Sequence, residues 1–150
     1  MTLTEKEKTL LKDLKESEKL CIEKYEKYAA DATKKELKCV FDEIKQVEQT
    51  HLSTINDILD GSEPSTESKG STFNPVAVEK ADYSEEERKK DKYLCEDALS
   101  TEKYVSATYN TAVFEFAQPA LRKALNHIQK EEQQHGEKIY NYMAENGIYN

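Results

Sequence analysis

The sequence is poor in the residues that interrupt helices. Its 150 residues include only 4 Gly and 3 Pro, and Trp is absent. Charged residues make up 35% of the chain, with Glu and Lys dominant, and both are good helix formers. No stretch shows the strict alternation of apolar and polar residues that is typical of strands. The composition therefore argues against a sheet protein and predicts an all-α domain.

Long apolar runs and paired cysteines are also missing. No stretch approaches the roughly 18–20 apolar residues of a membrane span, and the segment Met1–Lys6 holds no apolar signal core. Cys21, Cys39 and Cys95 form no CxxC pair, which argues against a disulfide framework or a zinc knuckle. We expect a soluble cytoplasmic protein whose reduced cysteines lie in the core or at its boundary.

The charge balance excludes two classes of partner. The net charge is −8, so we expect neither nucleic acid nor an anionic membrane surface as a partner. The length suits a single domain, residues 1–150, with a sizeable core.

Capping signals divide the chain into four expected helices. Thr4 and Ser84 are each followed three residues later by Glu, which is the capping-box pattern of a helix start. Gly61 follows the second apolar stretch, and Pro119 fits the first position of the last helix. The expected helices cover about residues 5–30, 34–59, 85–116 and 119–146.

The connections predict how these helices pack. Short turns make the first and last helix pairs antiparallel hairpins, at residues 4–60 and 84–147. The connection 61–83 is long enough to run the length of a bundle, so the third helix can lie parallel to the second. A bundle with one such crossover is ferritin-like, and we expect a ferritin-like four-helix bundle.

The two hairpins are related in sequence. A shift of 84 residues places 11–59 on 95–143 without a gap, and ten of the 49 pairs are identical. The identities concentrate on one face of each helix, which indicates a pseudo-twofold axis. The pairs include Asp13/Asp97, Glu18/Glu102, Tyr25/Tyr109, Glu48/Glu132 and His51/His135.

Six of these residues interrupt the apolar stripes in the middle of the helices. The first and third helices each place one glutamate there, and the second and fourth each place Glu-x-x-His. This is the ligand pattern of ferritin-like di-iron and di-manganese proteins. The predicted metal ligands are Glu18, Glu48, His51, Glu102, Glu132 and His135.

Electrostatics gives a reason for metal ions at this level of the core. Each buried, uncompensated carboxylate costs several kcal/mol, and two divalent cations would balance the four glutamates. We expect Glu48 and Glu132 to bridge the ions, and each histidine to bind one of them. Two iron ions are expected, although manganese or zinc also suits these ligands. The alternative is a relic site whose polar core is held by hydrogen bonds and protons.

Other residues carry weaker signals. Tyr25 and Tyr109 face the core two turns from the glutamates, where they could hydrogen-bond a ligand or pass an electron, but ordinary aromatic packing explains them equally well. Asp13 and Asp97 are expected to face solvent or the helix ends, and His127 to be a boundary residue.

Parts of the chain resemble a known family. The stretches Leu99–Tyr104, Glu131–His135 and Tyr142–Tyr149 are similar to the coat F domain of spore-forming bacteria, mostly over residues 91–150. The resemblance implies a ferritin-like fold and a spore coat or coat-associated role. The family usually ends in Gly-Trp-Tyr, where this chain has Ile148 in place of the tryptophan.

The ligand set itself is similar to that of bacterioferritins and rubrerythrins. Val105 occupies the position of a further rubrerythrin glutamate, so the six-ligand symmetric site is the better match. The CxxC pairs of a rubrerythrin electron-transfer domain are absent here, so electrons would come from another, unknown protein.

These observations leave several functions open. The first is a di-iron oxidoreductase of peroxidase or ferroxidase type that reacts with O2 or hydrogen peroxide. The second is a structural spore coat protein with a metal-stabilised or relic site. Iron storage is a weaker third, because nothing in the sequence specifies a cage. A homodimer is also expected.

Overall fold

The computed structural model describes residues 2–64 and 80–149. Within these residues the chain forms four helices and no strand, so the predicted all-α four-helix bundle is confirmed. The helices are α1 (Glu5–Asp31), α2 (Lys35–Leu59), α3 (Glu85–Glu115) and α4 (Pro119–Glu145). No helix among the described residues is long and apolar enough to cross a membrane.

The predicted helix ends are present. In both capping boxes the Thr4 or Ser84 hydroxyl accepts from the backbone N–H three residues later, and the glutamate there accepts from the cap N–H. These bonds satisfy N–H groups that the first helical turn leaves unpaired. Beyond α2 and α4 the chain turns at Gly61 and Gly147, whose φ angles of +92° and +62° favour glycine.

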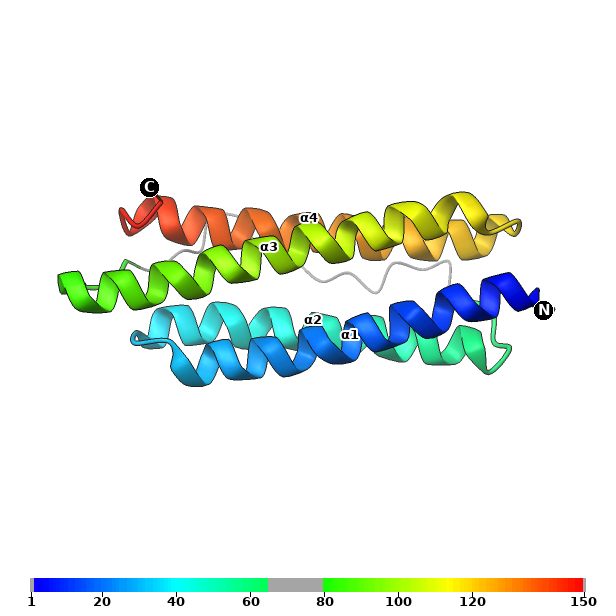
Figure 1. The fold of residues 1–150 in the computed structure, drawn as a ribbon, viewed down its shortest axis with the longest axis horizontal. Helices are drawn as coiled ribbons and strands as arrows, with labels where there is room; N and C mark the ends of the chain where they lie inside the picture. Colours follow the sequence, from blue (N-terminus) through cyan, green and yellow to red (C-terminus); the bar gives the residue numbers. More distant parts are fainter. Residues whose placement is uncertain (1, 65–79, 150) are drawn as a thin grey trace.

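Two antiparallel hairpins pack side by side (Figure 1). α1 pairs with α2 and α3 with α4, while α1 also contacts α3 and α2 contacts α4. α2 and α3 run in the same direction along the bundle, as the long connection predicted. Of the predicted crossover 61–83, residues 65–79 lie outside the described residues.

The apolar core is divided into two clusters. One is built around Tyr25, Phe41 and Tyr142, and the other around Leu11, Ile55 and Leu125. The two clusters include side chains from all four helices, and the stripe residues at mid-helix that belong to neither are the glutamates and histidines. The bundle thus places a buried polar layer between two apolar ones.

Two expectations outside this layer need correction. Cys21 and Cys95 are buried, but Cys39 is exposed on α2 because it lies two residues past Leu37, away from the apolar stripe. Asp97 does not simply face solvent, since its carboxylate accepts a hydrogen bond from the Tyr28 hydroxyl. Asp13 is exposed, as expected.

Candidate metal centre

The six predicted ligands meet at one level of the core. All of them are buried, with no side chain of the set more than 7% exposed. Their placement follows from the heptad-like spacing, which returns each residue to the inner face of its helix. The structure thus brings together the glutamates and histidines that the stripes singled out.

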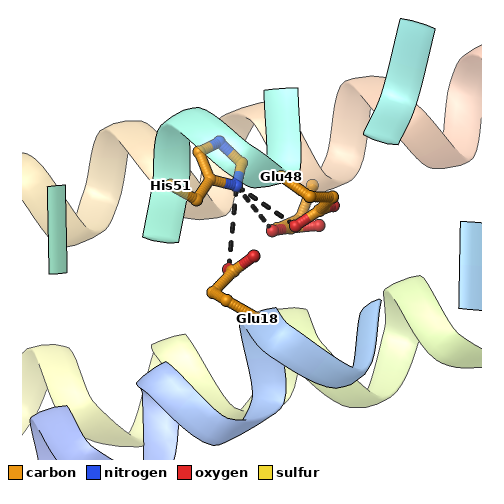
Figure 2. Close-up of side chains that lie close together, drawn as sticks. Glu18, Glu48 and His51 are labelled. Atoms are coloured by element: carbon orange, nitrogen blue, oxygen red, sulfur yellow. Dashed lines mark hydrogen bonds and ion pairs between the residues drawn. The ribbon is translucent and has the colours of Figure 1, made fainter. Parts of the chain in front are cut away.

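His51 shows how closely the groups approach. Figure 2 shows the His51 Nδ1 atom facing the carboxylates of Glu18 and Glu48. The distances are 3.7 Å to Glu18 Oε1 and 3.3 Å to Glu48 Oε2, and Nδ1 also lies 3.0 Å from Glu132 Oε1. One ring nitrogen therefore points at three carboxylate oxygens from three different helices.

His135 repeats this arrangement about the pseudo-twofold axis. Its Nδ1 lies 3.0 Å from Glu48 Oε1, 3.4 Å from Glu102 Oε1 and 3.5 Å from Glu132 Oε2. The two imidazole rings lie 6.0 Å apart between centroids. Each of Glu48 and Glu132 therefore contacts both histidines, whereas each of the other two glutamates contacts one.

Two overlapping groups of side chains follow from these contacts. In each group the candidate ligand atoms all lie within 4.8 Å of one another, and Glu48 and Glu132 belong to both groups. Glu18 and His51 complete the first group, and the other pair completes the second. Groups of this kind can hold a metal ion, and the bridging of two ions by Glu48 and Glu132 stays a prediction.

Unsatisfied atoms test whether metal ions fit this cluster. Buried polar atoms normally have hydrogen-bond partners, yet several atoms of the cluster have none among the described residues. They are Glu18 Oε2, Glu48 Oε1, Glu102 Oε2, Glu132 Oε2 and His135 Nδ1. Glu48 Oε1 and His135 Nδ1 lie 3.0 Å apart, but without hydrogen-bond geometry. Carboxylate oxygens and imidazole nitrogens without hydrogen-bond partners are free to act as ligands, and both kinds of atom suit divalent iron, manganese or zinc.

The ionisation of the metal-free cluster is strongly perturbed. Burial raises the pKa of Glu18 to about 8, helped by its hydrogen bond to Glu48. Burial and the neighbouring carboxylates raise the pKa of Glu132 well above its usual range. Burial also opposes charge on Glu48, but the neighbouring Glu18 carboxyl group and the two imidazoles hold its pKa well below the usual value. The three glutamates therefore differ in their tendency to hold a proton, which is high for Glu18 and Glu132 and low for Glu48.

The pKa values of the two histidines are shifted in the direction opposite to the one that burial alone would cause. Burial would lower the pKa of each imidazole, but the surrounding carboxylates raise both pKa values well above the usual range. Without metal, the raised pKa values of His51, His135, Glu18 and Glu132 favour the protonated forms of these groups. Metal ions would have to displace these protons.

The two tyrosines reach the glutamates across the hairpins. The Tyr25 hydroxyl on α1 donates to Glu102 Oε1 on α3 at 2.5 Å, and the Tyr109 hydroxyl on α3 donates to Glu18 Oε1 on α1 at 2.6 Å. Both hydroxyls stay protonated because burial raises their pKa values well above the usual range. They fix the two outer carboxylates in place; electron transfer through them stays a prediction.

Glu131 is a functional candidate that sequence reasoning missed. Its carboxylate lies 3.2 Å from His51 Nε2 and 3.0 Å from His127 Nε2. Carboxylates that hold the far nitrogen of a metal-binding histidine fix the orientation of the ring. The chain His51–Glu131–His127 runs from the centre to a half-exposed imidazole. The sequence signal was the His-x-x-x-Glu spacing of His127 and Glu131, which is equally typical of an ion pair on the solvent-exposed face of a helix.

This contact breaks the pseudo-twofold symmetry. At the position that the repeat pairs with Glu131, the first hairpin has Val47, so His135 lacks the matching carboxylate. We predict that Glu131→Val lowers manganese or ferrous affinity about 10- to 100-fold at the His51 site alone. Titration against a competing chelator resolves the two binding steps, with the exposed Glu145→Gln as control. Unchanged affinity at both steps would contradict an orienting role.

Comparison with known proteins gives one match. No curated protein matches the chain, and no solved structure matches it either. A family model does match the second hairpin, including α4 with its Glu-x-x-His motif and most of α3. The resemblance inferred from residues 91–150 is confirmed: residues 90–150 match the Coat F domain.

Proposed function

We propose that this protein holds two iron or manganese ions in its core and reacts with O2 or hydrogen peroxide. The observation that carries the proposal is the pair of overlapping ligand groups that share Glu48 and Glu132. Two such ions, when bound together, would supply two electrons to an O–O bond. The matched family model says nothing of this chemistry, so the proposal rests on the geometry.

The residues of the chain have distinct tasks in this proposal. Glu48 and Glu132 bind from the middle, and Glu18 and Glu102 close the two ends. Tyr109 and Tyr25 donate hydrogen bonds that keep these outer carboxylates turned toward the centre.

The apolar surroundings of the centre also contribute to the proposed function. The apolar clusters on both sides exclude bulk water along the bundle axis, which strengthens every charge interaction inside. Because the described residues contain no CxxC pair, we propose that a separate protein donates the electrons.

Loading with ferrous iron under anaerobic conditions tests the redox function. We expect that addition of O2 or hydrogen peroxide then oxidises both iron ions within seconds, with a new visible absorption band. A Glu48→Ala/Glu132→Ala variant should bind no iron and show only the background rate of free iron. Oxidation by the wild type at that background rate would sink the redox function and leave metal binding standing.

A spore coat role is the second candidate, and the Coat F domain match at residues 90–150 favours it. In that role the bundle is a building block, and the metal ions hold it together. The two roles separate in the same experiment, because a structural site raises the unfolding temperature without accelerating oxidation. Localisation in the spore coat follows from this candidate, and a homodimer is compatible with both.

A further inference from the structure

A pocket of about 620 Å³ lies between α3 and α4. We call it the α3–α4 pocket. Glu102 and Glu132 form part of its wall, although these residues are only 4% and 1% exposed. The pocket therefore leads from the surface of the second hairpin directly to two of the predicted ligands.

The repeat explains why the pocket lies in this hairpin. Gly136 and Ser106 line it, and the shift of 84 residues pairs them with Leu52 and Ile22 of the first hairpin. Both of these larger side chains are partly buried. A Cβ atom added at Gly136 would meet nothing within 4 Å, so the glycine leaves real space. The second hairpin thus lacks two apolar side chains that the first one has.

The pocket is larger than the proposed oxidants require. A water molecule occupies roughly 30 Å³ in the liquid, and O2 and hydrogen peroxide are of similar size. Pockets for organic ligands measure roughly 300–1,000 Å³, and this one falls within that range. Its size therefore indicates an organic molecule rather than a channel for the oxidant alone.

The lining determines the chemical class of that molecule. Leu99, Ala107 and Tyr140 provide apolar contacts, and the Tyr140 ring is held edge-to-face by Tyr149 at 4.7 Å between centroids. The neutral amides Asn110, Gln129 and Gln133 offer hydrogen bonds. The exposed residues Lys103 and Glu137 have opposite charges. The outer charges balance, and the inner wall adds the carboxyl groups of Glu102 and Glu132, so the lining favours a neutral ligand over an anion.

We propose that the α3–α4 pocket binds a neutral aromatic molecule that carries a hydrogen-bonding group, beside the Glu102–Glu132 side of the centre. Binding itself depends only on the pocket. That the bound molecule meets the metal ions rests on the proposed function.

Indole is a suitable probe, because it is neutral and planar with one N–H donor. We would titrate it into the ¹⁵N-labelled full-length protein, both metal-free and loaded with Zn²⁺, which is diamagnetic. We expect saturable shifts of the Ser106 and Gly136 amides in both forms. Gly136→Leu, which introduces the side chain of the first hairpin, should weaken binding at least tenfold, whereas Gly136→Ala should bind like the wild type.

Two further comparisons keep the test decisive. If Gly136→Leu does not fold, Ser106→Ile fills the pocket from α3 and should weaken binding in the same way. Zinc content, measured on the same samples, reports the metal centre separately from the pocket. Absence of saturable shifts at the pocket, shifts confined to another face, or equal affinity in the filled variants would each overturn the proposal.

Discussion

The metal-free protein should lose stability as the pH rises from about 5 to 8. Glu18 and Glu132 have raised pKa values in the folded state, Glu18 to about 8, so their protonated forms favour folding. That contribution is complete below the unfolded pKa near 4.5 and is lost as the pH rises through the folded pKa. The histidines, also with raised pKa values, act in the same direction above pH 6.5. Glu48, with its lowered pKa, contributes a constant stabilisation over this range.

Calorimetry in the presence of a chelator measures this effect. Loss of several kcal/mol corresponds to a fall in unfolding temperature of about 10 °C or more for a domain of this size. Manganese should reverse the trend, because the ions replace the protons and bind more tightly at higher pH. An unfolding temperature independent of pH, or highest at pH 8 without metal, would contradict the assigned proton distribution.

Replacing the whole polar layer by apolar side chains should stabilise the metal-free bundle. The variant would have Leu or Met at the six ligand positions, and Phe in place of Tyr25 and Tyr109, whose hydroxyls would otherwise lose their acceptors. Buried ionic groups are often less stabilising than apolar residues of similar volume, by 1–4 kcal/mol for a pair or triad. We expect a gain of at least about 3 kcal/mol and no response to metal.

The single replacement Glu48→Ala provides the contrast. It removes the charge that both histidines face, and should destabilise the metal-free protein by about 3–5 kcal/mol. Urea unfolding at pH 7 with a chelator compares the variants with the wild type. If the apolar variant is less stable than the metal-free wild type, the polar layer stabilises the fold through its own hydrogen bonds. That result would favour the relic-site alternative.

Much of this architecture could be predicted because local rules and the hydrophobic pattern agree. The capping boxes at Thr4 and Ser84 mark helix starts by hydrogen bonds over three residues, so no tertiary information is needed. The six ligand positions follow from helical spacing and the repeat. What spacing cannot supply is the partner across the bundle, such as Glu102 for Tyr25.

The missed residues share a physical reason. Glu131 lies next to a stripe residue, in a chain rich in glutamate, and only the packing of α4 against α2 shows that it reaches His51. Its repeat partner is Val47, and the comparison of the two hairpins selected only positions at which both have the same residue. Asp91 was missed likewise: it is fully buried and accepts hydrogen bonds from the Thr33 backbone and hydroxyl. Departures from the repeat, including Gly136, can be found in the sequence, but the space or contact that each one creates is visible only in the folded chain.

Metal content tests the central claim most directly. Elemental analysis of protein purified without a chelator or a histidine tag should find about two iron or manganese ions per chain, and none in the Glu48→Ala/Glu132→Ala variant. Such a result would establish the centre on which the redox proposal depends. No bound metal, and no uptake from anaerobic ferrous iron or manganese, would contradict the account and leave a bundle whose polar layer is held by protons and hydrogen bonds.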